Sequence, residues 1–182
     1  MIEKTLSLGW SGESEVCEML ERIDDELYFV EDIYLELDDR TTQIDALVFH
    51  KSGLYVLEVK NIGGTVFADN NKTTWKVTND YKVTGIHNPN LQNSLHIRFL
   101  RKIFGESFNW KSIVLFPDNT ELVGDKEELF SFSDLYTLFK GDDAIYTSEE
   151  LKNMHKLFSD VKDKNQYLCI KHHRQQERYT KR

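Results

Sequence analysis

Two neighbouring segments that are apolar on both faces constrain the fold of this chain most strongly. Residues 43–49 and 54–60 are rich in Ile, Leu, Val, Phe and Tyr at both odd and even positions. Strands of this kind lie in the middle of a sheet that is covered on both sides. The intervening residues 50–53 predict a hairpin loop, in which Gly53 takes a positive φ. The pair therefore predicts two central strands of one sheet.

The rest of the chain predicts helices before and after these strands. Apolar spacing and capping residues predict helices over 12–23, 89–104, 133–140 and 148–163. Apolar spacing and turn residues predict strands over 27–37, 64–68, 73–78, 110–116 and 166–171. In the second helix, Leu91, Leu95, Phe99 and Ile103 form an apolar stripe. The fold class is thus α/β: a mixed sheet in the order αβββαβ, flanked by helices, with a helical C-terminal extension.

Composition excludes several classes of protein. No run of about 18 apolar residues is present, so no membrane-spanning helix is expected. The N-terminus lacks the basic and apolar regions of a secretory signal. The two cysteines, Cys17 and Cys169, are isolated and lack zinc-binding spacing. We expect a cytoplasmic protein with buried thiols and no membrane partner.

Charge is distributed unevenly along the 182 residues, whose formal net charge is −8. Acidic residues dominate 12–40, whereas basic residues gather in 96–102 and in 171–182. Binding to phosphates generally needs a basic surface, so a nucleic-acid partner would have to use these local fields. Solvated faces explain the same segments, and the His172-His173 pair is expected to belong to a solvated basic tail.

Three charged residues interrupt the two apolar strands: Asp45, Glu58 and Lys60. Burying a charge costs free energy unless the charge is paired or binds a metal. A four-residue loop would pair Phe49 with Leu54, and counting back then places Asp45 opposite Glu58.

Opposed residues share a face of the sheet, with Cβ atoms about 5 Å apart, and alternation puts Lys60 on that face too. The three groups converge only if the loop length is even, because an odd loop would turn Asp45 to the other face. Two such carboxylates repel, and a divalent cation removes the repulsion. All-oxygen ligands suit Mg²⁺ or Mn²⁺. A structural salt bridge between Lys60 and the two acids is the alternative, and on these three residues alone it is the commoner arrangement.

Motifs around these three residues favour a catalytic site over a structural salt bridge. The motifs are Gly12-Glu13, Thr42-Gln43-Ile44-Asp45, the run 53–61 that ends in Glu58-Val59-Lys60-Asn61, Gly64, Trp75, and Asn88-Pro89 followed by Gln92 and His96. In this order, over residues 9 to about 116, the chain resembles the nuclease-related domain family, NERD, of the PD-(D/E)xK nuclease superfamily. Ile44 stands where the superfamily has proline, which is usual in the NERD branch.

The resemblance implies a restriction-endonuclease-like core and metal-dependent hydrolysis of DNA, or of RNA. It implies Asp45 and Glu58 as metal ligands, with the backbone carbonyl of Val59, and Lys60 as the catalytic lysine. Glu13 is implied as a further acid near the metal. We expect residues 1–120 to form the nuclease-related core and 121–182 a helical extension and basic tail packed on the same domain.

Other residues are weaker candidates. Gln92 and His96 are four apart and share a helical face, so Gln92 could hold the phosphate or the attacking water. His96, Arg98 and Gln43 are candidate substrate contacts, although a polar helix edge or a packing role explains them as well. The sequence thus predicts a Mg²⁺- or Mn²⁺-dependent nuclease, with DNA favoured over RNA and a homodimer as a possible assembly. The alternative is a nuclease-like module without catalytic activity that binds nucleic acid or a protein.

Overall fold

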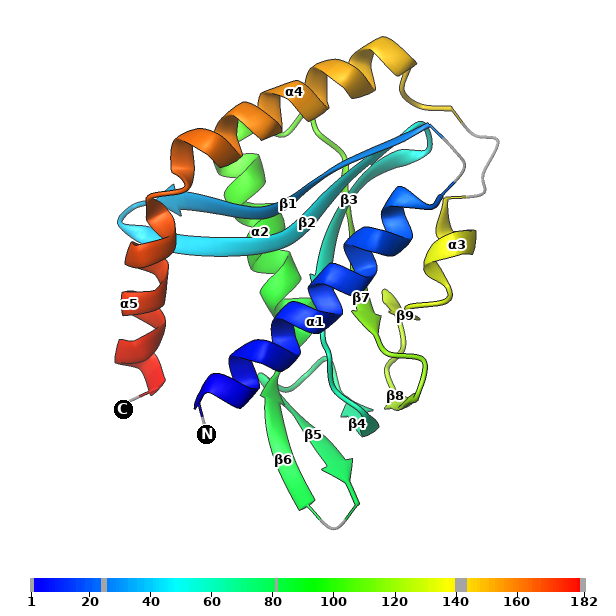
Figure 1. Ribbon diagram of the computed structural model, residues 1–182, viewed down its shortest axis with the longest axis vertical. Coiled ribbons are helices and arrows are strands. Elements are labelled where there is room, and N and C mark those ends of the chain that lie inside the picture. The colour runs from blue at the N-terminus through cyan, green and yellow to red at the C-terminus, as the bar shows by residue number, and fades with distance from the viewer. Residues whose placement is uncertain (1, 24–25, 81, 140–143, 181–182) are drawn as a thin grey trace. The chain divides into compact units, whose positions relative to one another are not determined.

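The computed structural model (Figure 1) describes residues 2–23, 26–80, 82–139 and 144–180. The chain divides into two compact units. Unit 1 comprises residues 1–25, 57–94 and 112–141, and unit 2 comprises residues 26–56, 95–111 and 142–182. The predicted α/β class is confirmed: helices flank two sheets that mix parallel and antiparallel strands. That residues 1–120 form a nuclease-related core and residues 121–182 a helical extension with a basic tail stays a prediction. No helix in the described part of the chain is both long and apolar enough to cross a membrane.

Unit 2 is built on a long antiparallel hairpin of β1 (Leu27–Leu37) and β2 (Arg40–His50). Asp38 and Asp39 form its turn with φ of 49° and 60°, as a two-residue hairpin turn of the favoured hand requires. Helix α4 (Ser148–Asn165) runs along β1 (Figure 1) and begins at the predicted capping box of Thr147 and Glu150. Phe158 and Leu151 of α4 pack into an apolar core with residues of β1 and β2, which fixes the hairpin on its helix.

The C-terminal segment differs from the prediction. Residues 166–171 are not a strand, because helix α5 (Leu168–Thr180) occupies this region. The segment is also not a free solvated tail: His172 is only 8% exposed, and its Nδ1 lies 3.1 Å from Thr41 Oγ1. Gln175 accepts hydrogen bonds from the backbone and hydroxyl of Thr41. These side chains hold α5 against the β1–β2 hairpin, and a charge pattern alone does not reveal such contacts.

This packing predicts a pH dependence of stability. Burial lowers the pKa of His172 below its ordinary value of 6.5, and the neighbouring His173 lowers it further. The unfolded chain therefore binds a proton that the folded chain does not, so stability is lost as pH falls from about 6.5 towards the folded-state pKa. Melting temperatures between pH 8 and pH 5 should fall less for His172→Gln than for wild type. His87→Gln, at an exposed position, is the control, and equal slopes for all three proteins would contradict the assignment.

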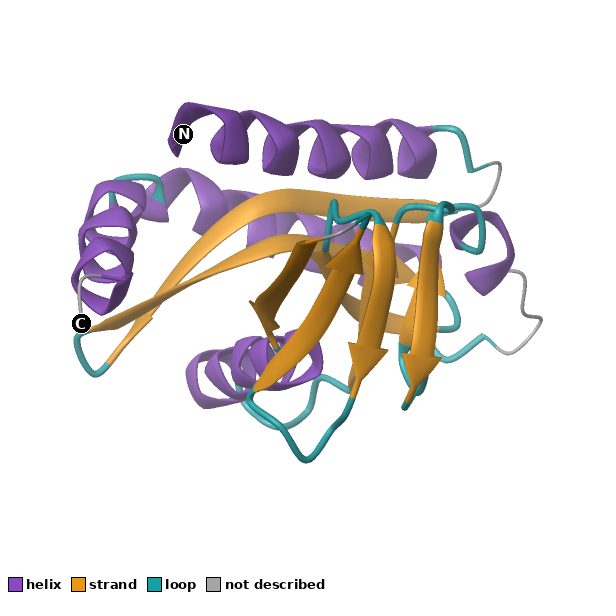
Figure 2. Cartoon of the chain, turned by 90° about the horizontal axis from the view of Figure 1, so that it is seen from below, coloured by secondary structure: helices purple, strands orange, loops and turns teal. Residues whose placement is uncertain are grey.

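Unit 1 contains helix α1 (Ile2–Glu21), the helix next to the N mark in Figure 2, and a second sheet with the order β6-β5-β4-β8. The strands are β4 (Gly64–Ala68), β5 (Thr74–Asn79), β6 (Lys82–His87) and β8 (Thr120–Gly124). The β4–β5 hairpin was predicted, whereas β6 and β8 were not. Helix α1 begins ten residues earlier than predicted. The short helix α3 (Leu135–Leu138) lies within the predicted segment 133–140, of which residue 140 is outside the described residues.

The first sheet has the order β1-β2-β3-β7-β9, in which β3 (Gly53–Val59), β7 (Trp110–Phe116) and β9 (Leu129–Ser131) follow the hairpin strands. Every residue of β3 is buried, as expected for a central strand. The loop before β3 has two residues, Lys51 and Ser52, rather than four, and Gly53 is a strand residue without positive φ. The loop length is even in both cases, and the pairing of Asp45 with Glu58 stays a prediction.

Helix α2 (Pro89–Phe104) has the predicted bounds, and Gly105 ends it with a φ of 96°. The apolar stripe of the helix is not its buried face. Phe99 packs against the core of unit 2, but Leu91, Leu95 and Ile103 are 38%, 48% and 39% exposed. Asn93, His96 and Leu100 are buried instead, so polar side chains with hydrogen-bond partners occupy part of the inner face of the helix.

Candidate active site

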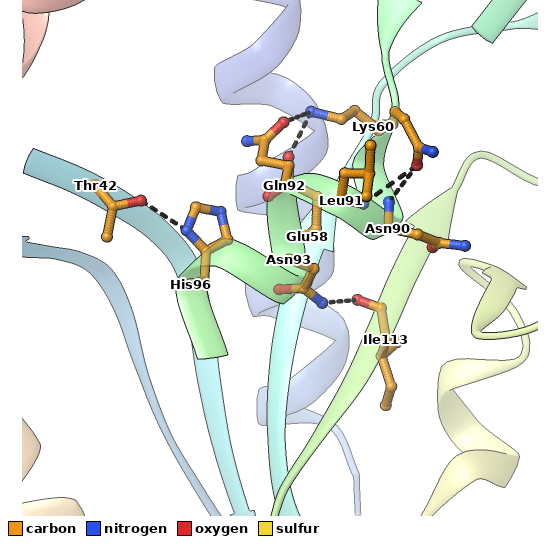
Figure 3. Close-up of polar contacts among 10 residues, drawn as sticks. Thr42, Glu58, Lys60, Asn90, Leu91, Gln92, Asn93, His96 and Ile113 are labelled. Atoms are coloured by element: carbon orange, nitrogen blue, oxygen red, sulfur yellow. Dashed lines mark hydrogen bonds and ion pairs between the residues drawn. The ribbon is translucent and has the colours of Figure 1, made fainter. Parts of the chain in front are cut away.

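The end of strand β3 carries a buried ion pair. Glu58 is 1% exposed, and the Lys60 ammonium, 19% exposed, pairs with its Oε1 atom (Figure 3). Alternation along an extended chain puts the two side chains on one side. The Lys60 backbone N–H donates to Leu115 O at 2.8 Å, so the pairing with β7 continues past the last residue of β3. A fixed backbone thus presents both charged groups at the end of a buried strand.

Gln92 of helix α2 completes this cluster. The Lys60 ammonium donates a hydrogen bond of 3.1 Å to Gln92 Oε1 as well as pairing with Glu58. The ammonium is therefore shared between a carboxylate and an amide from two separate elements, as Figure 3 shows. The structure brings together three of the predicted catalytic residues: Glu58, Lys60 and Gln92.

Two asparagines that the sequence analysis did not select as site residues hold helix α2 in place. Asn88 caps the helix, because its Oδ1 accepts from the backbone N–H of Asn90 at 2.9 Å and its Nδ2 donates to Lys72 O at 2.8 Å. Asn93 is fully buried and donates to Ser112 Oγ at 2.9 Å on β7. The Asn-Pro pair was a usable signal for the cap. Asn93 gave no such signal, because a polar residue with buried neighbours looks like any polar helix residue.

Helix α1 approaches the same strand end through Gly12. A Cβ atom built on Gly12 would lie 2.7 Å from Cβ of Asn61, the residue after Lys60. A glycine is therefore needed where the helix passes the chain that leaves β3. Glu13 is half-buried beside Gly12, and its role near a metal stays a prediction.

Gly12→Ala should weaken this contact. The added methyl overlaps Asn61 and forces a backbone shift, which typically costs about 1–3 kcal/mol. Urea unfolding should show that loss, and Asn61→Gly in the same chain should restore part of it, because it removes the Cβ atom that the added methyl meets. If Gly12→Ala is as stable as wild type, or if Asn61→Gly adds to the loss, helix α1 does not rest on Asn61 in this way.

Asp45 lies in unit 2, within strand β2. The pairs Glu31–Ala46 and Ile33–Ile44 of the β1–β2 ladder flank it. Across the ladder, Asp32 has a φ of 51°, a conformation that is uncommon outside glycine. Gln43 Nε2 donates to Asp32 Oδ1 at 3.0 Å, so the candidate substrate contact Gln43 is held beside Asp32. Asp45 itself is half-buried.

The two remaining candidates on α2 differ in exposure. His96 is 3% exposed, and its Nδ1 lies 2.8 Å from Thr42 Oγ1 (Figure 3). That arrangement favours a role in holding α2 against β2 in unit 2. Arg98 is exposed. Contact of either residue with a substrate stays a prediction.

Comparison with known proteins bears on what this site does. The model of a family described as nuclease-related domain, NERD, matches residues 8–117, which is more than half of the chain. The chain belongs to the NERD family.

A protein of Bacillus anthracis described as uncharacterized is 28% identical to this NERD protein over 156 residues, which cover 81% of this chain and 73% of the relative. No solved structure matches the chain. The matched residues 8–117 include Glu58, Lys60 and Gln92, so the charged cluster lies within the segment that defines the family. Membership suggests a nuclease-related function.

The described cluster offers one carboxylate to a divalent cation. Glu58 is a nearly inaccessible carboxylate that already has a cation, the Lys60 ammonium, beside it. Among the described residues no three His, Cys, Asp or Glu side chains gather to hold one metal ion. A divalent cation at Glu58 would therefore need further oxygen ligands from another side chain, the backbone, water or phosphate. Mg²⁺ is commonly bound in this way, by one or two carboxylates with several retained waters.

Proposed function

We propose that the chain is a metal-dependent nuclease whose centre is formed by Asp45, Glu58 and Lys60, with Gln92 holding the lysine. The observation that carries the proposal is the Lys60 ammonium shared between Glu58 and Gln92 at the end of a buried strand. A buried ion pair is weak support for stability by itself. Because the ion pair of Lys60 and Glu58 lies in a nuclease-related domain, we interpret it as catalytic.

Asp45 enters this proposal through the hairpin register. Strand β2 ends at His50 and β3 begins at Gly53, so a two-residue loop places these residues opposite each other. Counting back five residues on each strand pairs Asp45 with Glu58. The four-residue loop predicted from the sequence starts from Phe49 and Leu54 and reaches the same pair after four residues, so the implied register is the same for both loops.

Each side chain then has a role in hydrolysis. Asp45 and Glu58, with the Val59 carbonyl, would hold Mg²⁺ or Mn²⁺. When bound, such an ion polarises a phosphoryl oxygen and lowers the pKa of a bound water. Lys60 directs its N–H donors at the water or at a phosphoryl oxygen, where negative charge grows as the water oxygen bonds to phosphorus and the bond to the leaving oxygen breaks. Gln92 restricts the Lys60 ammonium to this position, and Glu13 is a further acid for the same site.

DNA rather than RNA is the proposed substrate, and Gln43, His96 and Arg98 are the proposed contacts around it. A cytoplasmic location and a homodimer belong to the same proposal.

The direct test is cleavage by purified protein. Plasmid, linear duplex, single-stranded DNA and RNA are incubated with Mg²⁺ or Mn²⁺, and with EDTA. The proposal expects cutting of DNA that EDTA abolishes. Binding without cutting of any substrate would instead favour the nuclease-like module without activity, and equal cutting in EDTA would exclude the proposed centre.

A further inference from the structure

In the described part of the chain, helix α2 is the only helix that carries cations and no acid. It contains Arg98, Arg101 and Lys102 and neither Asp nor Glu, in a protein whose formal net charge is −8. Helices α1, α4 and α5 each contain acidic residues. A surface that serves solubility alone generally mixes charges of both signs. The basic character of α2 therefore calls for a separate explanation.

The helix dipole explains only part of this charge pattern. Arg101 and Lys102 lie in the last turn of α2, where the partial negative charge of the helix end stabilises cations. A helix whose charges follow its dipole also favours acids in the first turn, as α4 does with Glu149 and Glu150. Helix α2 has no acid in its first turn, and Arg98 lies before its last turn.

The three cations share one accessible face of the helix. At about 100° per residue, Arg98, Arg101 and Lys102 fall within an arc of about 100°. All three are exposed, whereas His96 and Leu100 are buried on the opposite side. Arg98 and Lys102 are about 6 Å apart along the axis, and phosphates follow each other about every 3.4 Å along one strand of duplex DNA. This basic face of α2 can therefore meet two or three successive phosphates.

Interactions within the protein leave these cations accessible to a ligand. Neither Arg98 nor Lys102 has an ion-pair partner among the described residues. Arg101 Nε lies 3.6 Å from a carboxylate oxygen of Glu106, and the two side chains are 43% and 76% exposed. A surface ion pair of this kind contributes little free energy, so a phosphate can replace Glu106.

We propose that the basic face of α2 binds the phosphate backbone of a nucleic acid without regard to its sequence. Arg98 is already a proposed substrate contact, and Arg101 and Lys102 extend it to a surface of three cations. Contacts to phosphates fix the position of a duplex but do not read its bases. The inference rests on the proposed nuclease function for its ligand class, and it supplies a local positive field through which an acidic protein retains a polyanion.

The salt dependence of DNA binding tests this surface. Fluorescence anisotropy in EDTA measures the affinity of a labelled DNA duplex between about 50 and 200 mM NaCl. The variant combines Arg98→Gln, Arg101→Gln and Lys102→Gln. We expect it to bind at least about tenfold more weakly than wild type at the lower salt concentration. Its plot of log K against log salt concentration should be shallower by about 2–3, because each phosphate contact contributes about 0.9.

A second triple variant, on helix α4, is the matched control. Lys152→Gln, Lys156→Gln and Lys164→Gln remove the same three charges from exposed positions. This control should bind DNA with the affinity and salt slope of wild type, and both variants should keep the wild-type melting temperature because the substitutions are on the surface. Equal weakening in both variants would reduce the effect to net charge and overturn the proposal, as would a wild type that does not bind DNA at low salt.

Cleavage of the same duplex with Mg²⁺ separates this inference from the proposed nuclease. Binding that depends on the basic face, without cleavage by wild type, would keep the surface and refute the nuclease. Cleavage by wild type, with an unchanged KM for DNA in the α2 variant, would keep the nuclease and overturn the basic face.

An anionic membrane is the competing partner, because Leu95, 48% exposed, lies beside the cations on the same helix. Wild type and the α2 variant are sedimented with vesicles of phosphatidylcholine and phosphatidylserine. The proposal expects both proteins to stay in the supernatant. Sedimentation of wild type that the α2 variant loses would assign the basic face to a lipid surface and overturn the inference.

Discussion

Lys60→Arg is expected to reduce DNA cleavage about 10²–10³-fold, the usual effect of removing one donor that stabilises developing charge. Arginine keeps the positive charge beside Glu58, but its planar guanidinium cannot reproduce a compact ammonium held between a carboxylate and an amide. Initial cleavage rates at saturating Mg²⁺ measure the effect. The melting temperature should change little, because Glu58 keeps a cationic neighbour.

Lys60→Met distinguishes a catalytic role of Lys60, the stabilisation of developing charge, from a purely structural role. It leaves Glu58, 1% exposed, without its ammonium partner, which typically costs about 3–5 kcal/mol in a metal-free protein. Lys171→Met is the control, since it breaks the ion pair of Lys171 with Glu36, where both side chains are partly exposed. A loss of stability in Lys60→Met together with full cleavage by Lys60→Arg would mean that the ion pair is structural only.

Asp45→Asn is expected to have the second large effect, on metal binding. If Asp45 faces Glu58 as the hairpin register implies, removing its charge takes away one of two carboxylate ligands. Calorimetric titration with Mn²⁺ should show at least about tenfold weaker binding, and cleavage should fall about 10²-fold or more. Metal-free stability should be unchanged or higher, because two adjacent carboxylates repel.

Asp39→Asn is the matched control for this variant. It makes the same charge change in the same hairpin, at a turn residue whose left-handed φ asparagine tolerates well. If Asp45→Asn and Asp39→Asn bind Mn²⁺ equally well, Asp45 is not a ligand and the hairpin count does not describe the site.

Much of the fold was accessible from the sequence because local patterns decided it. Segments 110–116 and 89–104 have the predicted bounds, since each is a continuous periodic run with a clear start or stop. Residues 166–171 were wrongly predicted as a strand. Their apolar positions are too few to distinguish strand from helix, and the packing of His172 against Thr41 favours the helix.

The candidate site was predictable to a similar degree. Charged residues inside apolar strands pointed to Glu58 and Lys60, and helical spacing with the family motif pointed to Gln92. The contacts that fix their positions were not predictable, since they join residues far apart in the chain. Asn93 bonded to Ser112 and Gly12 packed on Asn61 are examples. The exposed Leu91 and Leu95 show in turn that apolar spacing along a helix does not by itself establish burial.

Cleavage of plasmid DNA by wild type and Glu58→Gln, prepared in parallel and assayed with Mg²⁺, tests the central claim most directly. Glutamine keeps the size of the side chain and an oxygen that can accept from Lys60, but it removes the proposed metal-binding charge. The account predicts at least about a 10²-fold lower rate for Glu58→Gln, with a similar melting temperature. Cleavage by Glu58→Gln at the wild-type rate would contradict the claim that this buried carboxylate is part of a nuclease centre.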